Sequence, residues 1–191
     1  PTPTVSPFGT VHNLPLPSHL YMARRFDEPV AEATALQARV PRSSMHWILV
    51  RIYWQQGLFD KALEEARLEL ELRGDTVLLA ALEEGLEAAG PTGAMRAMAE
   101  ALAARADESY VDPYKIGETF ARAGRVDEAL HWLDKAVDNG SIEIMYIPFR
   151  PEFDILRSDP RYRELVERIF RERAPTIMRL GTQAGDAPVT R

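Results

Sequence analysis

The sequence predicts an all-α protein built from short amphipathic helices that pair through tight turns. Apolar residues recur at helical spacing through most of the chain, most clearly between positions 110 and 137. Gly57, Gly90 and Gly124 stand about 33 residues apart, each between two such patterns. Glycine readily adopts the positive φ at which a helix commonly ends. The phrases FDEPV, FDKAL and VDEAL, which start at positions 26, 59 and 126, repeat in step with these turns.

The first 20 residues differ from the rest. They contain Pro1, Pro3, Pro7, Pro15 and Pro17, which exclude a regular helix or a central strand. We therefore expect residues 1–20, the proline-rich arm, to be extended and partly polyproline II in character. Two interpretations stay open: a flexible tail, or an arm that lies on a neighbouring subunit or on the helices of its own chain.

The periodicity divides the remaining chain into repeated units. We expect helix pairs over about 21–41, 43–73, 75–106 and 110–140, then a cap over 143–173 and an irregular tail over 174–191. Asp112 with Pro113 should start the first helix of the unit at 110–140. In the repeated phrase, Asp27, Asp60 and Asp127 are each expected to be the N-cap of a helix. Tyr162, Leu165, Val166, Ile169 and Phe170 follow helical spacing and predict an apolar stripe on the last helix.

The unit at 110–140 carries small and large residues in alternation across its two helices. The packing residues of the two helices are Gly117, Phe120, Ala129, Leu133 and Ala136. The turn residues are Gly124 in this unit and Gly57 in the unit at 43–73. In this pattern the unit resembles a tetratricopeptide repeat. The resemblance implies a right-handed superhelical solenoid of helix–turn–helix pairs with a C-terminal capping helix, in which first helices line a concave groove.

A second resemblance covers the end of the chain. The segments PEFD at 151–154 and LRSDPRY at 156–162 resemble the C-terminal region that follows such repeats in bacterial multidomain regulators. That context includes signalling and transcription-regulatory proteins. The sequence itself does not contain an upstream module of that kind.

Candidate binding residues come from the groove that the resemblance implies. Trp47, Arg51 and Trp54 share one side of a first helix, away from the side of Leu49, Val50 and Tyr53. Large aromatic residues beside an arginine are common anchors in interfaces. The set expected to line the groove is Trp47, Arg51, Trp54, Glu84, Glu87, Tyr114, Glu118 and Arg122. The alternative is that the tryptophan rings fill a core gap beside the unit at 21–41, which is incomplete because its first helix would have to contain Pro15 and Pro17.

Composition narrows the function. The four histidines, His12, His19, His46 and His131, lack metal-ligand spacing, and the chain has no cysteine. Neither a catalytic set nor a cofactor or metal site is expected. A net charge of -6 argues against nucleic-acid binding. Apolar runs stay well short of the roughly 20 residues of a membrane span.

These observations predict a non-catalytic interaction or scaffold module. It would bind a protein or peptide partner, as a subunit of a larger assembly. The alternative is the sensory or regulatory C-terminal region of a larger bacterial signalling or transcription-regulatory protein. Because Pro1 is not a translation start, we expect a segment ahead of it to have been removed. Both a cytoplasmic and a periplasmic or exported location stay open.

Overall fold

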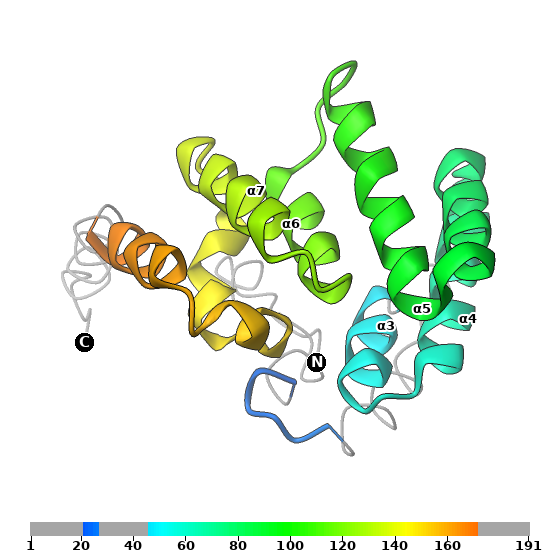
Figure 1. The fold of residues 1–191 in the computed structure, drawn as a ribbon, viewed down its shortest axis with the longest axis horizontal. Coiled ribbons are helices and arrows are strands. Elements are labelled where there is room, and N and C mark those ends of the chain that lie inside the picture. The colour runs from blue at the N-terminus through cyan, green and yellow to red at the C-terminus, as the bar shows by residue number, and fades with distance from the viewer. Residues whose placement is uncertain (1–20, 27–45, 172–191) are drawn as a thin grey trace, which may run out of the picture.

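The computed structural model describes residues 21–26 and 46–171, and all regular structure in those ranges is helical (Figure 1). The α-helices are α3 (His46–Gln55), α4 (Phe59–Arg73), α5 (Thr76–Ala106), α6 (Pro113–Arg122) and α7 (Val126–Asp138). Two 3₁₀ helices follow, η1 (Ile142–Phe149) and η2 (Pro151–Leu156), and residues 160–171 form a further α-helix. The all-α prediction is confirmed. The proline-rich arm, most of the unit at 21–41 and the tail at 174–191 lie outside the described residues.

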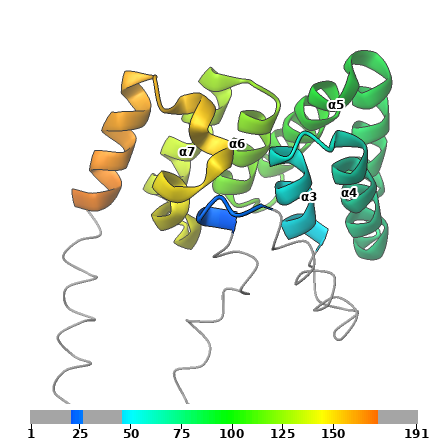
Figure 2. The same ribbon diagram turned by 90° about the horizontal axis from the view of Figure 1, so that it is seen from below.

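Helices α4 and α5 lie at one end of the molecule, α3 lies between them and α6, and the helix at 160–171 lies at the other end (Figures 1 and 2). Each α-helix from α3 to α7 packs on the next one along the chain. The short helix η2 also makes contacts far along the chain, because it packs on α3 as well as on α6 and α7. It therefore joins a late segment of the chain to the first of the described helices.

The predicted turns are confirmed at all three glycines. Gly57 and Gly124 have φ values of 72° and 75°, and Gly90 has a φ of 67° within α5. Ala89 and Gly90 depart from helical geometry, so α5 is two helical halves that meet at a bend. A Cβ atom on Gly85 would lie 2.4 Å from the backbone oxygen of Gly93, so the two halves touch through their backbones.

The prediction for helix starts is confirmed at one position and wrong at two. The Asp112 side chain accepts a hydrogen bond from the amide of Tyr114 at 3.0 Å and caps α6. Leu58 and Arg125, however, are the N-cap residues of α4 and α7, so Asp60 and Asp127 lie in the first turn. The residue after each turn glycine bonds back to the preceding helix and also begins the next one. The aspartates still face the positive end of the helix dipole.

The core around α6 and α7 packs as the alternation of small and large residues predicts. A Cβ atom on Gly117 would lie 2.9 Å from Cγ of Leu133, so the two helices approach closely at this point. The helix at 160–171 adds Leu165 and Ile169 to the same core. Phe170, expected on that stripe, is instead 45% exposed. In the described ranges, no helix has the length and apolar character needed to cross a membrane.

Candidate functional site

Three charged side chains from α3 and α6 form a buried ion cluster. Arg51 donates from Nε to Oε1 of Glu118 at 2.6 Å and from Nη2 to Oε2 at 3.1 Å. Arg122, one helical turn after Glu118, donates from Nη2 to the same Oε1 at 2.7 Å. The side chains of Glu118 and Arg122 are only 7% and 3% exposed. A charge this deeply buried requires such paired, hydrogen-bonded geometry.

Glu152 of η2 brings a second carboxyl group into this cluster. Its side chain has no exposed surface, and its Oε1 atom lies 3.8 Å from Arg51, 3.7 Å from Arg122 and 3.6 Å from Arg150. Its Oε2 atom accepts a hydrogen bond from the hydroxyl of Tyr21 at 2.6 Å. The cluster therefore holds together segments that are 131 positions apart in the chain.

The two carboxyl groups differ in acidity. Burial alone would raise the pKa of Glu118, but the guanidinium groups of Arg122 and Arg51 lower it well below its usual range. Burial and the neighbouring charge of Glu118 raise the pKa of Glu152, even though arginines surround it. Glu118 is therefore the member of the pair that carries the negative charge most firmly.

This difference predicts the effect of Glu152→Gln. Because the pKa of Glu152 is raised in the folded protein, its protonated carboxyl group stabilises the fold. This contribution is complete below the pKa of about 4.3 in the unfolded chain, and it is lost as the pH rises through the pKa in the folded protein. Glutamine cannot lose a proton, so the stability difference should shift in favour of Glu152→Gln between pH 4 and pH 8. Urea unfolding of both proteins across this range measures it. A difference that stays constant with pH would contradict the assignment; Glu64→Gln, at an exposed position of α4, is the control.

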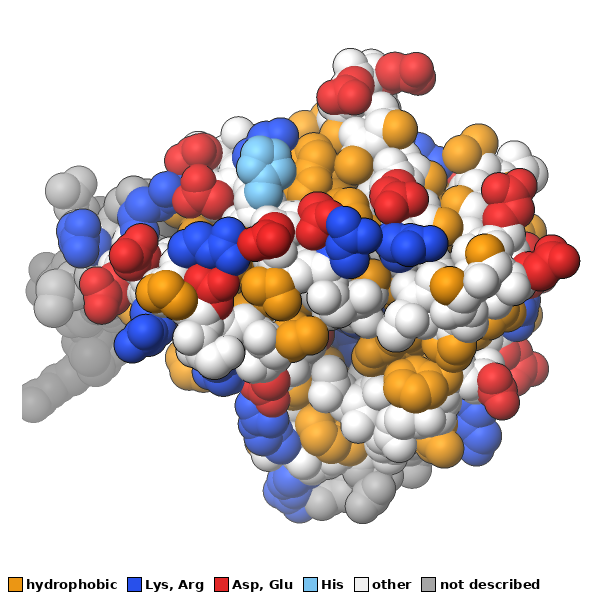
Figure 3. Space-filling model, viewed as in Figure 1, with side chains coloured by type: hydrophobic (Ala, Val, Ile, Leu, Met, Phe, Trp, Pro, Cys, Tyr) orange, Lys and Arg blue, Asp and Glu red, His pale blue; other side chains and the backbone are white. Residues whose placement is uncertain are grey.

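An apolar cleft of about 400 Å³ opens beside the ion cluster. It lies where the α3–α4 turn, the bend of α5, the end of α6 and η2 meet. The rings of Trp54 and Phe59 pack edge to face there, with centroids 4.8 Å apart. A second hollow of about 350 Å³ shares Phe59 and extends past Leu58 and Pro91. Figure 3 shows hydrophobic side chains gathered near the α3–α4 turn and the bend of α5. The cleft is lined by Trp54, Gln55, Phe59, Thr92, Ala121, Arg122, Gly124, Pro151, Glu152, Asp154 and Ile155.

The charged side chains in the cleft wall are already paired within the protein. Arg122 is bound to Glu118. Asp154 accepts two hydrogen bonds from Arg24, at 2.6 and 2.7 Å, and one from Arg157 at 2.6 Å. The surface that remains for a ligand is therefore apolar and aromatic. It suits an uncharged side chain better than an ionic one.

The structure places the eight predicted groove residues in different surroundings. Arg51, Tyr114, Glu118 and Arg122 come together, but in the interior, because η2 covers this side of α3 and α6. Trp54 lines the cleft. The others stand apart: Trp47 packs half-buried on the core near Val50, and Glu84 and Glu87 are exposed on α5.

Sequence reasoning missed Glu152, Arg150 and Tyr21 as parts of this cluster. The one local signal was a glutamate between Pro151 and Phe153, both of which are buried. A charge in an apolar stretch suggests a buried partner. The sequence does not show that this partner lies on α3 and α6 or near position 21.

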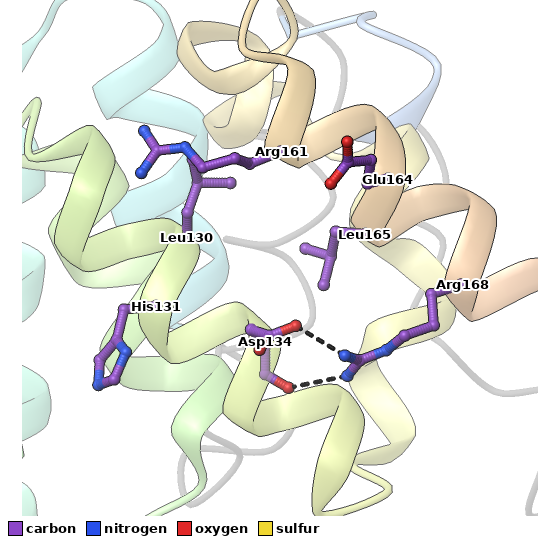
Figure 4. A pocket seen from close by; sticks show the side chains of 7 residues that line it. All are labelled: Leu130, His131, Asp134, Arg161, Glu164, Leu165 and Arg168. Atoms are coloured by element: carbon purple, nitrogen blue, oxygen red, sulfur yellow. Dashed lines mark hydrogen bonds and ion pairs between the residues drawn. The ribbon is translucent and has the colours of Figure 1, made fainter.

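A further hollow, also about 400 Å³, lies between α7 and the helix at 160–171 (Figure 4). Arg168 bridges it by pairing with Asp134 at 2.8 Å and with Asp138 at 2.9 Å. Arg161 pairs with Asp127 and Asp159, each at 2.7 Å. These pairs fasten the last helix to α7.

Comparison with models of known protein families, with curated proteins and with solved structures found no match to this chain. The resemblance to tetratricopeptide repeats rests on the residues in the sequence.

That geometry contains no metal-binding set in the described ranges, where no group of three His, Cys, Asp or Glu side chains is placed to hold an ion. Glu118 and Glu152, the closest approach to an acid–base pair, are shielded from solvent by their own partners. The cluster is therefore suited to joining segments of the chain, and the cleft is the more accessible surface.

Proposed function

We propose that this chain is a non-catalytic protein-interaction module with a tetratricopeptide-like arrangement of helix pairs, and that it binds an extended, uncharged peptide segment in the cleft at Trp54 and Phe59. The observation that carries this proposal is the cleft itself, an apolar hollow with an aromatic pair beside a rigid ion cluster. The module would act as a scaffold or as a subunit of a larger assembly.

The cleft has the properties of a peptide-docking surface. Phe59 and Ile155 are 38% and 47% exposed, so both side chains retain apolar surface that a partner can cover. Covering one such half-exposed side chain contributes on the order of 1 kcal/mol. The walls come from α3, α4, α5, α6 and η2, all fixed by the core. A preformed site loses little conformational entropy on binding.

The helix pairs support the same proposal. Successive pairs turn at Gly57, Gly90 and Gly124. The cleft reaches the last of these turns at Gly124, and the adjoining hollow reaches the first at Gly57 and the second at Pro91. A partner segment lying there would contact several units at once. Repeat arrays commonly bind partners over extended surfaces of this kind.

Selection of peptides from a random library against the full chain tests the proposal. We expect selected peptides to bind about fivefold more weakly to Phe59→Ser and to Ile155→Ser, since a loss of about 1 kcal/mol corresponds to roughly that factor. Phe170→Ser and Ile142→Ser are matched controls, because both residues are exposed and lie outside the cleft. The proposal fails if no peptide is enriched, or if the cleft variants and the controls bind the selected peptides equally.

A further inference from the structure

Residues 21–26 run along one wall of the cleft. The hydroxyl of Tyr21 bonds to Glu152, and Arg24 bonds to Asp154; both acceptors belong to the cleft lining. At the other end of the segment, Gln56 at the end of α3 donates a hydrogen bond to the backbone oxygen of Phe26 at 3.1 Å. Tyr21, the first residue of this segment, is therefore bonded directly to the wall of the cleft.

These contacts fix the position of Tyr21 firmly. Its side chain is only 2% exposed and packs with Ile48 and Ile52 of α3. Leu14 lies seven positions before Tyr21, a stretch that spans at most about 25 Å when extended. Because Tyr21 bonds to Glu152 in the cleft wall, this length is enough for the segment around Leu14 to reach the cleft.

The composition of the proline-rich arm matches the cleft. Residues 1–20 contain no Asp, Glu, Lys or Arg, whereas charged residues make up 27% of the whole chain. The segment Leu14–Pro15–Leu16–Pro17 is its most apolar part and ends four positions before Tyr21. Polyproline II segments of this kind dock in aromatic-lined grooves with little loss of entropy. An uncharged segment also leaves the paired charges of the cleft wall undisturbed.

We propose that residues 14–17 of the proline-rich arm occupy the cleft of their own chain. This inference rests on the proposed function and specifies it, because the arm then acts as an internal competitor for the partner segment. A partner must displace the arm. The apparent affinity of the partner is therefore its affinity for a free cleft multiplied by the fraction of molecules whose cleft is free. Partners that share the alternating apolar residue and proline of this segment are the best competitors.

A spin label on the arm tests this in the full chain. The protein has no cysteine, so Thr10→Cys gives a single attachment point. We expect the label to broaden the NMR signals of the Trp54 indole and of the amides of Gly57 and Gly124. Adding Leu14→Ser and Leu16→Ser, or Ile155→Ser in the cleft, should abolish this broadening. Val5→Ser in the arm and Ile142→Ser on η1 should leave it unchanged.

Two results would overturn the inference. One is the absence of broadening at the cleft in the labelled protein. The other comes from a mixture of spin-labelled chains with isotope-enriched chains that carry no label. If the signals of the isotope-enriched chains are broadened as strongly as before, the arm reaches a neighbouring copy.

A separate readout distinguishes the inference from the proposed function. If the arm fills the cleft about nine-tenths of the time, Leu14→Ser with Leu16→Ser should tighten binding of the selected peptides about tenfold. Unchanged peptide affinity, with intact broadening by the label, would show that peptides bind elsewhere and would contradict the proposed function alone. Tight peptide binding without broadening would contradict the inference alone.

Discussion

Glu118→Ala is expected to lower the free energy of unfolding by about 3–5 kcal/mol, because it removes one partner of a buried ion cluster. Arg51 and Arg122 would lose the carboxylate that both contact at 2.6–2.7 Å. Glu152 cannot replace it, since its Oε1 atom lies 3.7–3.8 Å from the same two side chains. Two guanidinium groups would be left next to each other without adequate compensation.

Urea unfolding at pH 7 measures this loss, with Glu84→Ala, at an exposed position of α5, as the control that should stay within about 0.5 kcal/mol of the wild type. A loss below about 1 kcal/mol for Glu118→Ala would show that the cluster is not a stabilising joint. The lowered pKa of Glu118 gives a second check. Its contribution is present above the unfolded pKa and is lost as pH falls through the folded value, so acidification should narrow the gap to Glu118→Gln.

The helices and turns could be predicted because their signals are local. Gly57, Gly90 and Gly124 each follow an apolar pattern within one or two turns of helix, and all three adopt positive φ. The exact start of a helix depends on finer geometry. Asp60 and Asp127 suit an N-cap by residue type, but the turn glycine leaves only one residue before the helix begins. The cap is therefore Leu58 or Arg125, and the aspartate falls inside.

The site was predictable only where a helix face determines it. Spacing along α6 puts Glu118 and Arg122 on one side, and the structure joins them to Arg51. Helical spacing does not show that η2 crosses the face of α6 that carries Glu118 and Arg122. A 3₁₀ segment has no long periodicity, and its contacts with α3 and Tyr21 span more than 90 positions of sequence. This non-local contact of η2 decides which of the predicted groove residues become buried.

The ion cluster and the cleft depend on each other. Glu152 fixes η2 against α3 and α6, and the neighbouring Pro151 and Ile155 form one wall of the cleft. Tyr21 and Arg24 hold the same wall from the N-terminal side. Loss of the cluster should therefore reduce peptide binding even where the helices persist. Changes on the cleft surface, such as Ile155→Ser, should spare the fold because they leave the buried pairs intact.

Gly85→Val should destabilise the protein by about 3 kcal/mol or more, since overpacking against backbone cannot be relieved by a change of rotamer. The new Cβ atom would lie 2.4 Å from the backbone oxygen of Gly93 and 2.8 Å from the Cβ atom of Ala97. The two halves of α5 would have to separate. That movement would also open the core formed by Leu82, Met95 and Met98.

Thermal unfolding of Gly85→Val against Ala80→Val measures this effect, because Ala80 is exposed on the same half of α5. Valine itself costs only about 0.5 kcal/mol in a helix, so the control should remain close to the wild type. Equal melting temperatures for the two variants would mean that the halves of α5 do not touch at Gly85 and Gly93. The bend at Gly90 would then not be a packed turn between two helices. Thr92 and Pro91 follow that bend, and they line the cleft and its neighbouring hollow respectively. The wall that α5 contributes to the cleft would then lie elsewhere.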